Sequence, residues 1–153
     1  MNKLTELHKF IVSAKAATYV GDGESFESCR KGSHDLSFSD GNYRYLDSYF
    51  GGANFIGEEV VYENEIPVWG MNYYGRILKP QKITAAQTGM MIKASLSQMY
   101  AEGRFLGGWE YAQDDLIYHD TSDGNLEYFS GLEWIEKDGI RVYELLYHGG
   151  LII

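Results

Sequence analysis

An internal repeat constrains the fold of this chain more than any other feature of its sequence. Residues 57–78 align with residues 131–152 over 22 positions without a gap. Six of these positions are identical, whereas a chain of ordinary composition would give about one or two by chance. The identical pairs are Gly57 with Gly131, Glu59 with Glu133, Ile66 with Ile140, Val68 with Val142, Tyr73 with Tyr147 and Gly75 with Gly149. The sequence therefore predicts two copies of one structural unit, at about residues 1–80 and 81–153.

The spacing of apolar residues predicts that each copy begins with a helix. Apolar residues recur at helical intervals between residues 4 and 17 and again between residues 83 and 99. The first helix is expected to end near Gly21, and the second to begin at Pro80 and stop at Gly103. Polar residues of the first helix are expected to lie off its apolar stripe; they are Glu6, Lys9 and Lys15.

Antiparallel strands are expected after each helix. Residues 21–34 are rich in Gly, Ser and charged residues and have little periodicity, which is typical of a long loop. Beyond them, apolar and polar residues alternate around turn signals at Asp40-Gly41-Asn42 and Ser122-Asp123-Gly124. The expected strand segments are 36–38, 43–50, 55–62, 66–78, 109–117, 126–136 and 140–153.

These elements predict the α+β fold class. The fold is expected to contain two copies of a helix plus an antiparallel-meander unit, related by a pseudo-twofold axis. Neither copy could bury its sheet face alone, and 153 residues suit one domain of ordinary size. We therefore expect a single domain over residues 1–153 with an internal duplication.

Charge and cysteine content narrow the possible partners and location. The net charge of -9 repels nucleic-acid phosphates and anionic membranes, but it admits a cationic small molecule. There is no run of eighteen apolar residues that could span a bilayer as a helix. The lone cysteine, Cys29, and the charged first residues predict a cytoplasmic protein without disulfides or a signal peptide. We expect no nucleic acid, membrane, cofactor or metal partner, and the oligomeric state stays open.

Two histidine–aspartate pairs resemble parts of catalytic sites. His34-Asp35 and His119-Asp120 place imidazole beside carboxylate, and Cys29 or Ser33 could act as a nearby nucleophile. Adjacent residues of a strand point to opposite faces, so neither pair forms a catalytic dyad by itself. A loop histidine and a turn-forming aspartate are the simpler interpretation, and the catalytic residues, if there are any, stay unknown.

The last strand of each copy predicts where a ligand would bind. Core positions are alike between the copies, whereas the opposite face has diverged, as in Tyr74 against His148. Such divergence is expected if the place where the two final strands meet binds an asymmetric ligand. Neutral substitution on two exposed strands would give the same pattern. The candidate ligand-binding residues on and near these strands are Glu59, Trp69, Asn72, Tyr74, Arg76, Glu144 and His148.

The chain also resembles a known family at several short motifs. These are Arg30-Lys31-Gly32-Ser33-His34-Asp35-Leu36, Gly51-Gly52, Phe55-Ile56-Gly57-Glu58-Glu59, Pro67-Val68-Trp69-Gly70-Met71-Asn72-Tyr73-Tyr74-Gly75-Arg76, Val142-Tyr143-Glu144 and Tyr147-His148-Gly149-Gly150. They resemble the bacterial domain of unknown function family 5680, some of whose members carry a helix-turn-helix segment. The resemblance supplies no activity or catalytic residues, but it implies a link to regulation.

Three classes of function are compatible with this sequence. The leading hypothesis is a small-molecule-binding or sensory domain, since effector-binding domains of multidrug regulators also have duplicated α+β architectures. An enzyme of unknown class with an acid and histidine cleft is the second, and a protein-interaction module the third. A closed cleft with convergent carboxylate and histidine would favour the enzyme, and a flat exposed apolar patch would favour the interaction module.

Overall fold

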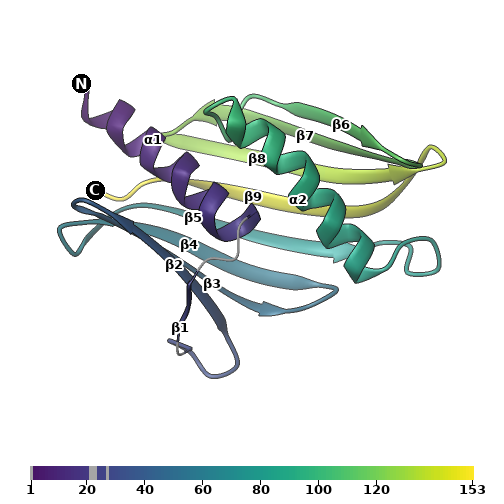
Figure 1. The fold of residues 1–153 in the computed structure, drawn as a ribbon, viewed down its shortest axis with the longest axis horizontal. Coiled ribbons are helices and arrows are strands. Elements are labelled where there is room, and N and C mark those ends of the chain that lie inside the picture. The colour runs from purple at the N-terminus through teal and green to yellow at the C-terminus, as the bar shows by residue number, and fades with distance from the viewer. Residues whose placement is uncertain (1, 21–23, 27) are drawn as a thin grey trace.

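The protein has an α+β fold in which two helices cover one face of an antiparallel sheet. The computed structural model describes residues 2–20, 24–26 and 28–153. Within these residues the sheet has nine strands in the order β1-β2-β3-β4-β5-β9-β8-β7-β6. Figure 1 shows both helices on the same side of the sheet, with the central pair β5 and β9 joining its two halves. No helix in the described part of the chain has the length and apolar content needed to traverse a bilayer.

The helices and strands follow one another along the chain in two similar series. The first series consists of α1 (Lys3–Lys15), a π-helix (Ala16–Val20), β1 (Glu24–Phe26), β2 (His34–Asp40), β3 (Tyr43–Gly51), β4 (Phe55–Glu63) and β5 (Ile66–Ile77). The second consists of α2 (Ala85–Ala101), β6 (Trp109–Gln113), β7 (Leu116–Asn125), β8 (Tyr128–Lys137) and β9 (Ile140–Leu151).

The helix boundaries differ from the predicted ones for local reasons. Helix α2 begins at Ala85 and not at Pro80, because Thr84 and Gln87 form a reciprocal capping box. The α-helical part of α1 ends at Lys15 and continues as the π-helix, while the predicted end at Gly21 lies outside the described residues. Lys15 is also buried, contrary to the prediction, because it follows Ile11 by one helical turn and faces the sheet.

Some strand boundaries also differ from prediction. The predicted strand 109–117 is two strands, since Asp114, with φ 54°, forms a tight turn between β6 and β7. The predicted turn at Ser122-Asp123-Gly124 is the end of β7, which continues to Asn125. Strand β1 lies within the segment predicted as a loop, of which residues 21–23 and 27 fall outside the described residues.

The strand register separates two faces of the sheet. Strands β5 and β9 pair with Tyr73 opposite Tyr147, and the alternation places both side chains on the face that the helices cover. The helix-covered face holds the apolar core, including Trp69, Met71 and Leu145. The open face is the other side of the sheet, where the intervening residues of the same strands point.

Two glycines let long side chains cross the helix-covered face. Gly57 and Gly131 pair with Tyr73 and Tyr147 in the neighbouring strands. A Cβ atom at either glycine would overlap the tyrosine ring that lies over it. The absence of a side chain therefore lets each tyrosine reach across one strand to an aspartate on the strand beyond.

Replacement of either glycine by alanine should destabilise the fold. Gly57→Ala and Gly131→Ala are each expected to lower the free energy of unfolding by about 1–3 kcal/mol, because the tyrosine ring must move. Gly89→Ala in α2 is the matched control, since no atom lies within 4 Å of the added Cβ and alanine favours a helix by about 1 kcal/mol. Urea denaturation measures all three changes, and unaltered stability of both strand variants would contradict this account.

Candidate functional site

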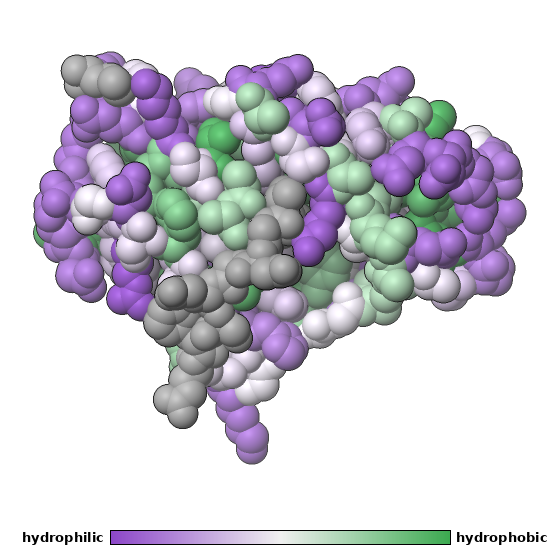
Figure 2. Space-filling view, in the orientation of Figure 1, coloured by the Kyte–Doolittle hydropathy of each residue, from purple (hydrophilic) through white to green (hydrophobic). Residues whose placement is uncertain are grey.

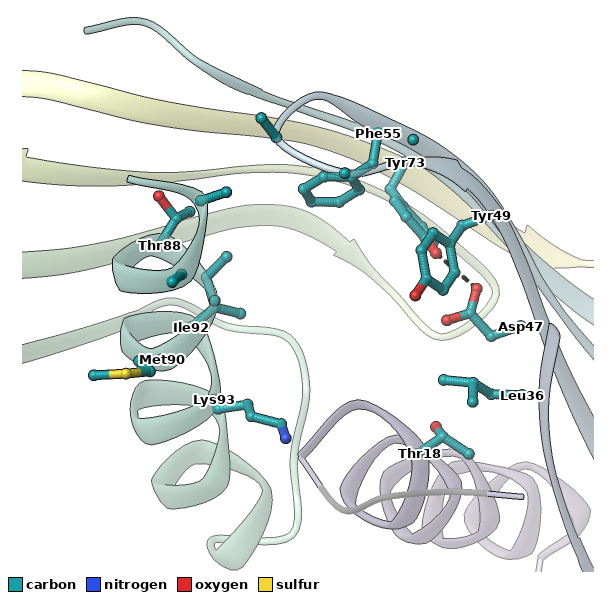
Figure 3. A pocket seen from close by; sticks show the side chains of 16 residues that line it. Thr18, Leu36, Asp47, Tyr49, Phe55, Tyr73, Thr88, Met90, Ile92 and Lys93 are labelled. Atoms are coloured by element: carbon teal, nitrogen blue, oxygen red, sulfur yellow. Dashed lines mark hydrogen bonds between the residues drawn. The ribbon is translucent and has the colours of Figure 1, made fainter. Parts of the chain in front are cut away.

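A cavity lies between the helices and the first half of the sheet. It has a volume of about 450 Å³ and opens between the π-helix, at Thr18, and helix α2, where Figure 2 shows hydrophobic surface in a hollow. Strands β3, β4 and β5 form one wall and the first half of α2 forms the other (Figure 3). The larger apolar side chains that line it are those of Leu36, Tyr49, Phe55, Tyr73, Met90 and Ile92.

Asp47 supplies a carboxyl group to this apolar wall. Its side chain points toward the cavity beside Tyr73, whose hydroxyl donates a hydrogen bond of 2.7 Å to Asp47 Oδ1 (Figure 3). Burial raises the pKa of Asp47 to about 7, and the negative charge of nearby Glu59 acts in the same direction. Asp47 therefore exchanges a proton near neutral pH.

A second, smaller cavity continues the polar region under the helices. It measures about 40 Å³, and Tyr73 contributes to its wall as well as to that of the large cavity. Three carboxyl groups line it, those of Glu59, Asp120 and Glu133. Lys15 enters from α1 and places Nζ 2.6 Å from Glu59 Oε2, with both side chains buried.

Tyrosines satisfy two of these three carboxyl groups. Tyr118 and Tyr143 each donate a hydrogen bond to a different oxygen of Glu133. Tyr147 donates to Asp120 Oδ1 at 2.8 Å. Desolvation by burial raises the pKa of Glu133 to about 7 and that of Asp120 to about 6 despite these bonds.

Glu59 differs from Glu133 because one of its oxygens has no partner. Lys15 binds Glu59 Oε2, whereas Glu59 Oε1 is buried without a hydrogen-bond donor in the described part of the structure. Trp69 occupies the strand position of β5 that Tyr143 occupies in β9, and its indole nitrogen donates to the carbonyl oxygen of Leu126. A buried acceptor without a donor is uncommon in folded proteins, where buried polar atoms nearly always have a partner.

The seven residues predicted to bind a ligand divide between the two faces of the sheet. Glu59 and Trp69 are fully buried on the helix-covered face. The other five lie on the open face, and they are Asn72, Tyr74, Arg76, Glu144 and His148. The structure therefore does not bring the seven together at one cavity.

The open-face group contains a surface ion pair beside two other predicted residues. Arg76 donates to Glu144 from Nη2 at 2.8 Å, and this hydrogen bond lowers the pKa of Glu144. Asn72 pairs with His148 across β5 and β9, with both side chains exposed.

The two histidine–aspartate pairs also separate across the sheet. His119 stacks on Trp134 on the open face, whereas Asp120 is buried beneath the helices and is not the turn residue that was predicted. Asp35 is a buried strand residue too. Cys29, Ser33 and Ser48 donate hydrogen bonds to its carboxylate, and these bonds lower its pKa to about 2. Both aspartates thus have structural partners other than the adjacent histidine.

Sequence reasoning missed Asp47 altogether and missed the burial of Asp120 and Lys15, although a signal was present for Asp47. Asp47 has the same alternation phase as Tyr45 and Tyr49, which places its carboxyl group on the core side. In the described residues, no group of three or more His, Cys, Asp or Glu side chains is arranged to hold a metal ion.

Comparison with known proteins gives one family match. The family model described as Domain of unknown function (DUF5680) matches residues 47–152, which confirms the resemblance seen in the sequence motifs. The match includes Asp47 and all of α2, and therefore much of the cavity wall. No curated protein and no solved structure matches the chain.

Proposed function

Because the chain belongs to the DUF5680 family, whose description names no activity, we propose from the geometry that it is a small-molecule-binding or sensory domain. The observation that carries this proposal is the cavity of about 450 Å³ with Asp47 in an otherwise largely apolar wall. Binding sites for small molecules commonly have volumes of about 300–1,000 Å³ and combine apolar walls with a few placed polar groups. The ligand would enter between the π-helix and α2.

The two alternative functions have weaker support. An acid and histidine cleft would favour an enzyme, and the described residues that line the large cavity include no histidine. An interaction module would use the open face, where Ile56, Tyr74 and Leu146 are adjacent across three strands and at least 45% exposed. This apolar row is narrow, and polar residues such as Asn72 and His148 adjoin it.

We also infer that the cavity belongs to one half of an internally duplicated fold. In support, β5 and β9 pair about the Tyr73–Tyr147 position, and both tyrosines donate to an aspartate two strands away. Trp69 stacks on Phe129, and Tyr143 correspondingly stacks on Phe55. In this alignment Gly124 corresponds to Gly51, since both glycines close the same type of strand connection. The similar turn sequences at Gly41 and Gly124 are therefore not equivalent positions of the two halves.

Filling the large cavity should abolish ligand binding without unfolding the protein. Gly89 lies on α2 in the cavity wall, and no atom lies within 4 Å of an added Cβ, so Gly89→Trp can place its ring in the opening. We expect at least a tenfold loss of affinity for compounds found in a thermal-shift screen of neutral, acidic and basic molecules.

The matched control is Gln98→Trp, which adds the same ring to an exposed position of α2 away from the cavity. It should bind the same compounds as the original protein. Equal affinity of the Gly89→Trp variant and the original protein, or no stabilising compound in a broad screen, would contradict the proposed function.

A further inference from the structure

We infer that the ligand of the large cavity carries a protonated amine whose N–H groups bind Asp47 and the unpartnered oxygen of Glu59. This inference rests on the proposed function, because it specifies the chemistry of the molecule bound there. It specifies that the ligand is positively charged, that its amine forms the hydrogen bonds, and that this amine lies at the deep end of the cavity.

The strand register brings the two carboxyl groups together. Asp47 on β3 pairs directly with Glu59 on β4, and both side chains lie on the helix-covered face. Cβ atoms at such positions are about 4.5–5.5 Å apart. Asp47 lines the large cavity and Glu59 the small one, while Tyr73 lines both. Tyr73 lies where the two cavities adjoin, so an ammonium group that binds Asp47 at the deep end of the large cavity is one strand pair away from Glu59.

Glu59 requires a donor that the described residues do not supply. Its side chain is fully buried, Lys15 binds only Oε2, and Oε1 has no partner. Leaving a buried acceptor unpaired costs about 1–3 kcal/mol, and more for a charged group. A ligand that donates to this oxygen would remove that cost on binding.

The groups around Asp47 favour a positively charged donor. In the described walls of the two cavities, four side chains are acidic and two, Lys15 and the exposed Lys93, are basic. Lys93 lies on α2, on the wall opposite Asp47 (Figure 3). The titratable or charged groups that act on Asp47 or line the same cavities are Asp35 of β2, whose side chain lies on the opposite face of the sheet, Tyr45 and Tyr49 of β3, Glu59 of β4, Tyr73 of β5, Lys15 of α1 and Lys93 of α2.

A primary ammonium group matches these acceptors better than other cations do. It has three N–H donors on one small atom, whereas a quaternary ammonium has none. Tyr73 already donates to Asp47 Oδ1, which leaves further acceptor capacity on the carboxylate. Tyr49 and Phe55 offer aromatic surface to the apolar part of such a ligand.

Binding of the amine should release a proton. The pKa of Asp47 is raised to about 7, so the empty site is protonated in mild acid and must ionise before it pairs with an ammonium. An amine that stays charged at both pH values should therefore bind about thirtyfold more weakly at pH 5.5 than at pH 8.5.

Titration calorimetry of the full chain with tryptamine and three analogues tests the inference. At pH 8.5, tryptamine should bind at least ten times more tightly than neutral tryptophol or the quaternary N,N,N-trimethyltryptammonium, and indole-3-propionate should bind weakest. Asp47→Asn should reduce the affinity for tryptamine at least tenfold and remove most of its pH dependence, and Glu59→Gln should also weaken binding. Glu58→Gln is the matched control, because Glu58 is exposed on the open face.

The outcomes separate this inference from the proposed function. Binding of tryptophol or indole-3-propionate as tight as that of tryptamine would overturn the amine assignment and leave a small-molecule site in place. Failure of tryptamine to bind, while neutral compounds from the broad screen do bind, would have the same meaning. Failure of every compound in both experiments would remove both proposals.

Discussion

Replacement of Lys15 by methionine should lower the free energy of unfolding by about 3–5 kcal/mol at pH 8. Methionine keeps most of the apolar volume but leaves Glu59 without its buried counter-charge, in a region that also holds Asp120 and Glu133. The loss should be smaller at pH 5, because protonation of neighbouring carboxyl groups then reduces their repulsion. Urea denaturation at the two pH values measures both effects.

A second substitution and a surface control make this prediction specific. The double variant Lys15→Met with Glu59→Gln should regain most of the lost stability, since it removes the unpaired charge together with its partner. Lys3 lies on the same helix as Lys15, and Lys3→Met breaks an exposed ion pair with Glu63 of β4, which should cost less than about 1 kcal/mol. Equal effects of the Lys3 and Lys15 substitutions would show that the buried pair has no special role.

The strands of the central sheet could be predicted because alternation along the sequence reports the two faces directly. The predicted segment 55–62 is β4, Phe55–Glu63, and the segment 66–78 is β5, Ile66–Ile77. Their core positions repeat in the second half, as with Tyr73 and Tyr147, since side chains that fill the same sheet face have the same size constraints. Helix and turn boundaries were less accurate because caps such as Thr84 depend on single hydrogen bonds.

The candidate site could not be located from sequence because its polar residues break the usual rule for burial. Acidic residues are rarely buried unless they are paired, so Asp120 was predicted to form a turn and Asp47 was not among the candidate residues. Their burial depends on Tyr73 and Tyr147, which reach them only because the intervening strands carry glycine. Two residues of this cluster were also candidates in the sequence, Glu59 through its repeat partner Glu133 and Asp120 through the His119-Asp120 pair.

The stability of the protein should have a maximum near pH 4 and decrease toward pH 8. The buried carboxyl groups of Asp47, Asp120 and Glu133 have pKa values raised to about 7, 6 and 7, above the ordinary values of 3.8, 3.8 and 4.5. The folded state therefore binds more protons than the unfolded state between about pH 4 and 7. Their contribution to stability is fully present below the unfolded-state values and is lost as the pH rises through 6 to 7.

Other groups oppose this trend on the acid side. The pKa of Asp35 is lowered to about 2 by its hydrogen bonds, so its contribution is present above the ordinary value of 3.8 and disappears as the pH falls toward 2. Burial also lowers the pKa of His8, which weakens the folded state below about pH 6.5. The two opposing sets of groups place the maximum between their titration ranges.

Thermal unfolding between pH 3 and 8 measures this profile. We expect a difference of at least about 3 kcal/mol between pH 5 and pH 8, which corresponds to a midpoint at least about 6 °C higher at pH 5 in a chain of this size. The measurement should be made in 0.5 M NaCl, because salt screens repulsion among surface charges but leaves the burial of these carboxyl groups unchanged. The triple variant Asp47→Asn, Asp120→Asn and Glu133→Gln should flatten the profile above pH 5, whereas Glu58→Gln on the open face should leave it as it is. A midpoint that rises from pH 5 to pH 8, or an undiminished slope in the triple variant, would mean that these carboxyl groups are ionised in the folded protein at pH 5.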